Sequence, residues 1–557
     1  MQRKQLTLVI VSLLVVVLSV SLAYFTTQII GKGKTVDVSS ANLQIVFTDS
    51  DGALTETDIE PGWQKTKTFT IKNDTKTEYK YNIVIKDLLN TFVTNEYLKY
   101  KITSTNGGYN MTEFKDIPKS SAPKDTILAY SASIPVGVTQ SYTIEFKYAN
   151  DGSVDQSDDM GKKLSGTLFI TEGTEDIYAG YEEGTLGYQI MGDNPTRETR
   201  EKFDTTFTDN TTGTLYKATE KNVHNTTDTT VYYYAGNTTN NWVKFGKYQN
   251  DLVVYRGYYN STDTTDYKEY STMSDCTSAS SYNVNCTEHK YANAGDYIYW
   301  RIIRTNADKS IRLLYSGVSP NTTEGYIKTT KFKEMYDDPM YVGYMYGTSG
   351  SQASNRTNTN NSTIKTTIDT WYASNLEAKG YTKYLSTTAV YCNDRDLASG
   401  GTYDKSSSFY YAPRYRAFSL RTPTYDCTVS TDAFSVDNIS AKLDYPIALM
   451  TSDEIMYAGG KMGGSLSSPY TWFYLNSSSD KIVNTHWWLM SPTQWDNTIK
   501  MAYVSSVGGY NGNLLPLNVE STGVIRPALS LKSCVKYASG DGSASNPYTI
   551  EETSTGC

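Results

Sequence analysis

The strongest constraint on the fold is an alternation of apolar and polar residues with a period of two, between about residues 38 and 172. Over residues 79–86, tyrosine and isoleucine alternate with lysine and asparagine, and residues 43–47 and 142–148 repeat the pattern. Successive side chains of a strand point to opposite faces, so this pattern indicates strands with one buried face. Glycine-containing turns at 106–108 and 150–152 separate them. Several short strands in one segment predict a β-sandwich.

The N-terminus has the pattern of an export signal. Arg3 and Lys4 precede an apolar run from Leu6 to Ala23, which ends in the small-x-small sequence Ser21-Leu22-Ala23. This pattern predicts cleavage after Ala23. A span of roughly 20 apolar residues also crosses a bilayer, so a retained anchor is the alternative. Residues 1–23 are therefore a signal peptide or a membrane anchor, and the chain contacts a membrane only if they are retained. In both cases we expect the remainder to be extracellular, at the cell surface, beginning with an N-terminal arm at residues 24–37.

The six cysteines all lie in the second half of the chain: Cys276, Cys286, Cys392, Cys427, Cys534 and Cys557. An even number in an exported protein indicates three disulfides, for which about 15 pairings exist. Short loops close at the least entropic cost, which favours pairing between sequence neighbours. The sequence contains no C-x-x-C, so zinc and redox roles lack support.

Charge and composition exclude one class of partner. The chain has 51 Lys and Arg against 59 Asp and Glu, a net charge of −8, and no basic block beyond its first residues. Nucleic-acid binding requires clustered cations, so we expect no nucleic-acid partner. The 49 tyrosines against 15 phenylalanines suit β-rich, half-hydrated surfaces.

The second half of the chain mixes strands with two helices. Ser362 and Gly380 bound one predicted helix, and Thr451 with Glu454 forms the capping box of another. Residues 173–230 are rich in Gly, Thr, Asp and Asn and are predicted to be a linker, with a short helix near 195–203. The predicted strands are 241–246, 297–304, 311–315, 487–490, 501–506, 514–519 and 524–531.

The first region resembles the camelysin/TasA family of Gram-positive matrix proteins. The resemblance covers about residues 1–172 and rests on Ser21-Leu22-Ala23-Tyr24-Phe25, on Pro61-Gly62 leading into residues 68–73, and on residues 141–144. It implies a jelly-roll-like β-sandwich over residues 38–172. It also implies assembly into extracellular fibres, and some members of the family were once described as proteases.

The second region resembles a bacterial domain family of unknown function, whose members read WWLRSP and then GVRPAL. The motifs here are residues 448–455, 487–492 and 523–529. Together with the element order, the resemblance implies an α+β, C-type-lectin-like domain over residues 231–534. Residues 535–557 form a tail that a disulfide ties to the domain. The whole chain is thus predicted to be mainly β.

The sequence offers no complete catalytic or metal-binding motif. Residues 31–35 imitate a P-loop, but Gln28 stands where the motif requires glycine. Residues 49–52 are a fragment of a calcium loop without its remaining carboxylates. The three histidines, His224, His289 and His486, lack zinc-ligand spacing, and no G-x-S-x-G accompanies His486. We therefore predict no catalytic residue, no metal and no cofactor.

The predicted ligand site lies in the loops between the late strands, where lectin-like folds bind. Its residues are Trp495, Asp496, Asn497, Tyr510 and Asn511, because aromatic rings beside amides and carboxylates suit sugars. Trp487 and Trp488 are predicted to be core residues.

The sequence thus predicts a non-catalytic protein that adheres to glycans or proteins of host or bacterial surfaces. One alternative is a matrix-fibre subunit whose residues 24–38 add a strand to a second copy of the chain. The other is a secreted enzyme.

Overall fold

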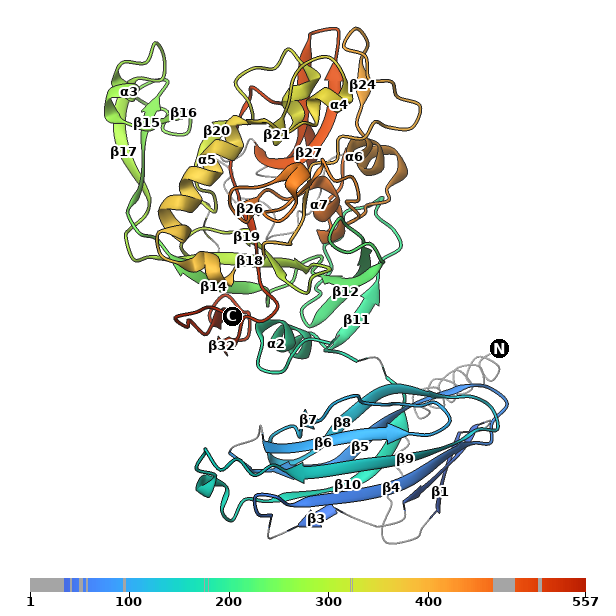
Figure 1. Cartoon of the computed structure of the whole chain (residues 1–557). Coiled ribbons are helices and arrows are strands. Elements are labelled where there is room, and N and C mark those ends of the chain that lie inside the picture. The colour runs from blue at the N-terminus through green and yellow to red at the C-terminus, as the bar shows by residue number, and fades with distance from the viewer. Residues whose placement is uncertain are drawn as a thin grey trace, which may run out of the picture. The chain divides into compact units, whose positions relative to one another are not determined.

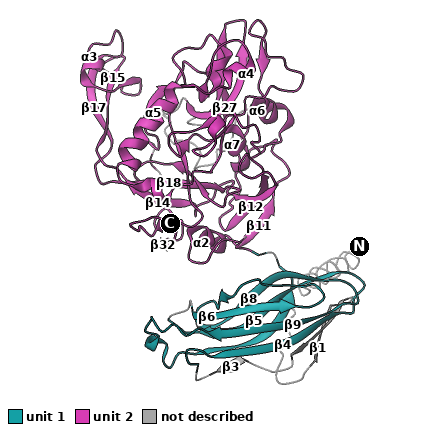
Figure 2. Cartoon of the chain, in the orientation of Figure 1, with its two compact units in different colours: residues 1–176 teal, residues 177–557 magenta. Residues whose placement is uncertain are grey.

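A computed structural model describes residues 35–40, 43–49, 54–56, 59–93, 97–174, 176–178, 180–320, 322, 324–463, 486–508 and 513–557. The chain divides into two compact units, residues 1–176 and residues 177–557 (Figure 2). Both units are built chiefly from strands, which confirms the mainly β prediction.

Unit 1 consists of two antiparallel sheets that share one hydrophobic core (Figure 1). Inward side chains such as Ile71 and Ile144 come from one sheet, and Ile83 and Ile170 come from the other. The six-stranded sheet has the order β1 (Thr35–Ser40), β2 (Leu43–Asp49), β4 (Gln64–Asn73), β9 (Thr139–Tyr148), β6 (Leu98–Ser104) and β7 (Lys115–Asp116). The four-stranded sheet has the order β3 (Leu54–Glu56), β10 (Leu164–Glu172), β5 (Tyr79–Asn90) and β8 (Ser120–Ile134). A short 3-10 helix spans Ser157–Asp159.

Unit 2 is organised around two larger sheets. The ten-stranded sheet follows β11 (Thr196–Thr199), β12 (Thr214–Glu220), β13 (Thr229–Tyr233), β18 (Tyr297–Thr305), β14 (Trp242–Lys247), β33 (Tyr548–Ile550) and β32 (Tyr537–Ser539), with β19 (Ile311–Tyr315), β31 (Ala528–Leu531) and β26 (Ile447–Ala448) attached. The six-stranded sheet follows β20 (Thr329–Lys331), β30 (Thr522–Val524), β27 (His486–Asp496), β28 (Met501–Gly508) and β29 (Leu514–Asn518), with β24 (Phe409–Tyr410) on β27.

Smaller elements complete unit 2. A three-stranded sheet, here called the inserted sheet, contains β16 (Tyr267–Tyr270), β15 (Leu252–Tyr258) and β17 (Val284–Ala292), with α3 (Met273–Thr277) beside it. Two strand pairs are β21 (Met345–Tyr346) with β22 (Asn360–Asn361), and β23 (Tyr391–Cys392) with β25 (Ala433–Phe434). The helices are α2 (Leu186–Asp193), α4 (Gln352–Asn355), α5 (Thr363–Tyr372), α6 (Ala412–Tyr415) and α7 (Ser452–Ala458). Pro339–Val342, Tyr381–Tyr384 and Ile439–Ala441 are 3-10 turns, and Ala373–Glu377 and Arg416–Leu420 are π turns.

Both predicted helix starts are confirmed. The Ser362 side chain accepts the backbone N–H of Lys365 and begins α5, which continues as a π turn until Gly380 at φ 73°. The Thr451 hydroxyl accepts the Glu454 N–H at the start of α7, and the Glu454 carboxylate accepts the Thr451 N–H in return. Local capping chemistry therefore places both helices as the sequence indicated.

Residues 177–230 form part of unit 2 rather than the predicted linker. Apolar residues of α2, including Ile190 and Met191, are buried in the main core. The expected helix near 195–203 is instead β11, which pairs in parallel with β12. The polar composition concealed these elements, because few apolar residues per strand suffice when an existing core covers them.

The last three residues of the predicted arm, residues 35–37, belong to a strand instead. Thr35–Ser40 forms β1 and pairs antiparallel with β2 of its own sheet. The described residues contain no helix long and apolar enough to cross a membrane. The predicted signal or anchor at residues 1–23, with its cleavage site after Ala23, lies outside the described residues.

The disulfide prediction is confirmed. Cys276 pairs with Cys286, Cys392 with Cys427, and Cys534 with Cys557. The last bridge ties the C-terminal tail, whose strands β32 and β33 extend the ten-stranded sheet. The tail is therefore a structural part of unit 2.

Candidate functional site

One candidate site is a groove between α5 and the inserted sheet, which lie beside each other in Figure 1. Its volume is about 440 Å³, within the range of roughly 300–1,000 Å³ that small-molecule sites occupy. The groove is lined by Asn250, Asp251, Leu252, Val253, Val254, Ser271, Ile327, Lys328, Thr366, Thr367, Thr370, Trp371, Ser374 and Asn375.

One wall of the groove is the polar face of α5. Thr366, Thr370 and Ser374 are exposed and recur every four residues, which places them along one side of the helix. The opposite face buries Ile364 and Ile368 in the core. The amphipathic period of α5 thus anchors the helix and presents a row of hydroxyls to the groove.

The other wall comes from β15 and the residues just before it. Val254 is buried, Leu252 and Val253 are half-buried, and they give this wall an apolar surface. At its edge, the Asp251 carboxylate accepts hydrogen bonds from Lys290 Nζ at 2.6 Å and from the Ala294 N–H at 2.7 Å. The hydrogen bond from Lys290 is the main cause of the lowered pKa of Asp251.

A polar network anchors the inserted sheet to the rest of unit 2. Arg256 of β15 is buried, and its guanidinium donates to Tyr326 at 3.2 Å and to Glu324 at 3.1 Å. It also donates to Tyr291 of β17 at 2.9 Å. Since Tyr326 and Glu324 lie outside the inserted sheet, these two contacts fix the position of the groove wall.

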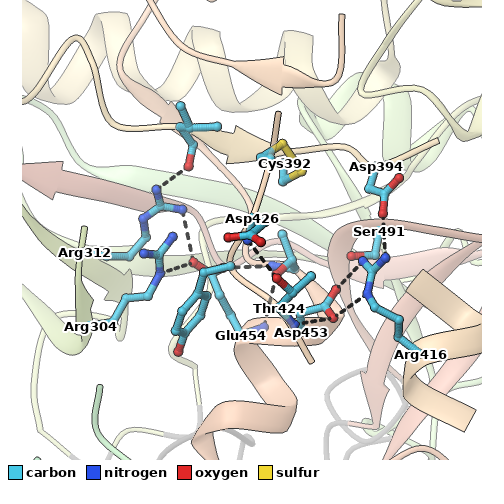
Figure 3. Close-up of a pocket in the computed structure, with 14 residues that line it drawn as sticks. Arg304, Arg312, Cys392, Asp394, Arg416, Thr424, Asp426, Asp453, Glu454 and Ser491 are labelled. Atoms are coloured by element: carbon cyan, nitrogen blue, oxygen red, sulfur yellow. Dashed lines mark hydrogen bonds and ion pairs between the residues drawn. A yellow bond between two sulfur atoms is a disulfide. The ribbon is translucent and has the colours of Figure 1, made fainter. Parts of the chain in front are cut away.

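A second, smaller cavity lies among buried charges and has a volume of about 20 Å³ (Figure 3). Glu454 Oε1 accepts from Arg304 Nε at 3.0 Å and from Arg312 Nη1 at 3.2 Å. Arg304 Nη1 lies 2.6 Å from Glu220 Oε2, and Arg416 bridges Asp453 and Asp394. The space holds about one water. The charges pair with one another, so we interpret this region as a structural network.

The electrostatics of Glu454 reflect this pairing. Burial acts to raise its pKa, but the charges of Arg312 and Arg304 and the Thr451 N–H outweigh that effect, and the pKa is lowered. Nearby, Asp394, Asp396 and Asp432 lie close together. Arg416, Arg356 and Arg395 pair with these three carboxylates, so the group is part of the same ion-pair system.

The structure corrects the predicted ligand loop. Trp495 is 1% exposed, lies in β27, and donates its indole N–H to the Lys405 carbonyl at 3.1 Å. Asp496 is the last residue of the same strand. The strand is longer than predicted because β28 pairs with it as far as Asp496 and β24 covers its end. Asn497 is half-buried, while Tyr510 and Asn511 lie outside the described residues. Trp495 is therefore a core residue of a strand rather than a loop residue, and the ligand site as a whole stays a prediction.

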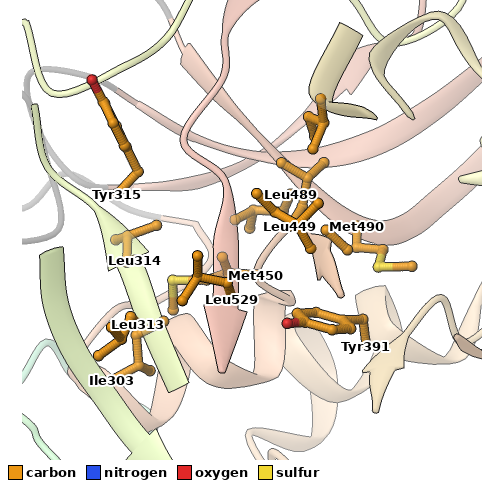
Figure 4. Packing of buried hydrophobic residues seen from close by; sticks show 14 of the residues in the cluster. Ile303, Leu313, Leu314, Tyr315, Tyr391, Leu449, Met450, Leu489, Met490 and Leu529 are labelled. Atoms are coloured by element: carbon orange, nitrogen blue, oxygen red, sulfur yellow. The ribbon is translucent and has the colours of Figure 1, made fainter. Parts of the chain in front are cut away.

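The preceding part of β27 is core, as predicted. Trp487 and Trp488 are fully buried, and Trp488 Nε1 donates to the Thr330 carbonyl at 2.9 Å. Figure 4 shows Leu489 and Met490 packed near Leu449 of the same core. His486 begins the strand half-buried, and burial lowers its pKa.

Sequence reasoning missed the groove itself. The sequence predicted the helix that begins at Ser362 and the pairing of Cys276 with Cys286, but not that these two parts of the chain lie close together. The available signal was the hydroxyl-rich outer face of α5, with Thr366, Thr367, Thr370 and Ser374.

Comparisons with known proteins give no family. No family model and no curated protein matches the chain. Among solved structures, a ruminal GH26 endo-beta-1,4-mannanase matches with 11% identity and a TM-score of 0.15. The match covers 31% of this chain and 36% of the mannanase chain. A chaperone–tip adhesin complex of CFA/I fimbriae matches with 11% identity and a TM-score of 0.06, over 43% of this chain and 84% of that one. Both TM-scores are too low to indicate a shared fold.

Proposed function

We propose that this chain is an extracellular, non-catalytic surface protein that binds a glycan in the groove between α5 and the inserted sheet. The observation that carries the proposal is the groove, with its volume of about 440 Å³ and its lining of hydroxyls and amides around an apolar floor. Sugars combine apolar C–H surfaces with many hydroxyls, and this lining complements both.

The lining residues favour binding over catalysis. Among the described residues of the groove there is no histidine or cysteine, and the two charged side chains are Asp251 and Lys328. Asp251 pairs with Lys290, and Lys328 Nζ donates to Ser271 at 3.0 Å. General acid–base catalysis requires a group that exchanges its proton near the operating pH, within reach of the substrate. Asp251, in its ion pair with Lys290, and Lys328, bonded to the Ser271 hydroxyl, are poorly suited to that role.

Two further features support an extracellular location. Three disulfides are typical of proteins that fold in an oxidising compartment. The apolar run before Ala23 has the pattern of an export signal. The resemblances to matrix proteins and to a lectin-like family agree with this proposal.

Glycan-array binding of the full chain tests the proposal. We expect Thr370→Trp to abolish array binding, because the bulky side chain would fill the groove from its helix wall. Lys379→Trp, an exposed position just beyond the helix that does not line the groove, is the matched control. Absence of glycan binding by the unmodified chain, or equal binding by both variants, would contradict the proposal.

A second candidate function is a structural subunit of a fibre. In the six-stranded sheet of unit 1, β1 lies at the edge of the described strand order. An edge strand is a template for pairing with another chain, and head-to-tail addition builds a filament. We expect the chain from Tyr24 to form filaments in negative-stain microscopy and a version from Ser39, which lacks most of β1, to elute as a monomer. Monomeric behaviour of both at high concentration would exclude this function.

A further inference from the structure

The hydroxyl side chains on the α5 wall of the groove donate their hydrogen bonds to backbone carbonyls of the same helix. The hydroxyls of Thr366, Thr370 and Ser374 donate to carbonyl oxygens four residues earlier, at 3.2, 2.8 and 2.9 Å. Thr367 donates in the same way at 3.0 Å. Asn375 Nδ2 donates to the Trp371 carbonyl at 2.9 Å.

The consequence follows from counting donors and acceptors. A hydroxyl has one hydrogen and two lone pairs, and an amide oxygen is an acceptor. With their hydrogens directed to the helix backbone, the four hydroxyls have only lone pairs left for a ligand. The Asn375 amide keeps a second hydrogen, but this side chain is 6% exposed and contributes little to the surface of the wall. A ligand group that donates a hydrogen bond to one of these oxygens breaks no hydrogen bond within the helix. A ligand that accepts must first break an internal hydrogen bond, so its net gain is small.

We propose that this acceptor-only wall makes the groove select neutral, hydroxyl-rich oligosaccharides over carboxylated ones. The inference rests on the proposed function and adds the class of glycan. A carboxylate has no hydrogen to donate at neutral pH and would face the lone pairs of Thr366, Thr370 and Ser374. A neutral sugar hydroxyl, in contrast, donates to one of these oxygens directly.

The charged side chains at the groove edge also act on the binding of a carboxylated ligand. The Asp251 carboxylate is a further acceptor and is paired with Lys290. Lys328 carries the ammonium of the lining, and its hydrogen bond to Ser271 directs it toward the inserted sheet rather than toward the hydroxyl row. The test therefore includes a variant that separates the effect of Lys328 from that of the helix wall.

The experiment measures the affinity of the full chain for pairs of hexamers by titration calorimetry. Cellohexaose is compared with a glucuronan hexamer, and mannohexaose with a mannuronate hexamer. Within each pair the backbone is the same, and a carboxylate replaces each hydroxymethyl group. We expect the neutral member that binds to bind at least about tenfold tighter than its carboxylated partner, roughly the effect of one to two hydrogen bonds.

The variants assign the selectivity to the wall. Thr366→Val and Thr370→Val remove one acceptor each with little change of shape, and each should weaken binding of the neutral hexamer about twofold to tenfold. Thr363→Val makes the same change on the same helix outside the groove and should leave affinity unchanged. Lys328→Met should preserve the preference for the neutral hexamer. Thermal melting checks that all four variants fold.

Three outcomes would overturn the inference. If the carboxylated hexamer binds as tightly as the neutral one, the wall does not select. If the two wall variants behave like Thr363→Val, the selection arises elsewhere. If Lys328→Met removes the preference, the ammonium controls it. The proposed function survives each of these results, since the groove still binds a glycan, whereas binding of no hexamer together with an empty glycan array removes both.

Discussion

Replacing Glu454 by alanine tests whether the buried charge network stabilises unit 2. The Glu454 carboxylate is 2% exposed, and it receives Arg304, Arg312 and the Thr451 N–H at 3.0, 3.2 and 3.0 Å. Without it, Arg304 retains Glu220 as a carboxylate partner, but the buried Arg312 loses the carboxylate that it contacts. The start of α7 loses half of its capping box as well.

The expected magnitude is large for a single substitution. Removing one partner of a buried ion pair destabilises by about 3–5 kcal/mol, because an uncompensated charge stays buried. Exposed pairs contribute up to about 1 kcal/mol. Glu334, whose side chain is 60% exposed beside Lys331, therefore provides the matched control. We expect Glu454→Ala to lower the melting temperature of unit 2 by roughly 4–6 °C and Glu334→Ala to change it by less than about 2 °C.

Differential scanning calorimetry of the full chain measures both variants, with the transition of unit 1 as an internal reference. Glu454→Gln keeps the shape of the side chain and removes its charge, so its loss should fall between those of Glu454→Ala and Glu334→Ala. Equal melting temperatures for Glu454→Ala and Glu334→Ala would refute the assignment of the network as a stabilising element.

Three further predictions concern pH, the inserted sheet and the N-terminus. The lowered pKa of Glu454 means that the folded state holds this proton less tightly than the unfolded state. Its stabilisation is therefore complete above the usual value of 4.5 and is lost as pH falls through the lower folded-state pKa. Urea unfolding at successive pH values should show this loss in the unmodified chain and a smaller one in Glu454→Gln; parallel pH profiles would argue against it. Replacing Cys276 and Cys286 by serine should weaken glycan binding, because the bridge closes the sheet that forms one groove wall. Unchanged affinity would show that the anchoring network alone holds that wall. N-terminal sequencing of the secreted protein should begin at Tyr24, and a blocked or intact Met1 would indicate a retained anchor.

His486→Gln should leave ligand binding intact. The histidine is half-buried at the start of β27 and is not among the residues that line the groove. Glycan-array binding and a thermal melt of the variant check this together. Loss of an activity with folding preserved would instead give His486 a chemical role.

Local chemistry accounts for the features that the sequence predicted correctly. The alternation over residues 142–148 became β9, whose side chains are buried at every second position, because a strand with one buried face requires a period of two. Ser362 and Thr451 started helices, because their side chains satisfy backbone N–H groups within three residues. The disulfide partners followed loop length, since nearby cysteines meet at the least entropic cost.

Contacts between residues far apart in the sequence determined the features that the sequence did not predict. Residues 177–230 are polar in sequence, yet they pair with strands of a core that other segments supply. The sequence around Trp495 predicts a loop. In the structure this residue lies in a strand that pairs with β24, which is more than eighty positions earlier in the chain.

The sequence by itself therefore determined the strands with a clear apolar pattern, the helix caps and the covalent cross-links, which depend on neighbours a few residues apart or on short loops. Only the tertiary structure decided the groove and the charge network. The groove requires residues 250–254 to face residues 366–375, and Glu454 meets arginines about 150 positions away. Such encounters depend on how whole elements pack, and the packing of distant elements leaves no periodic trace in the chain.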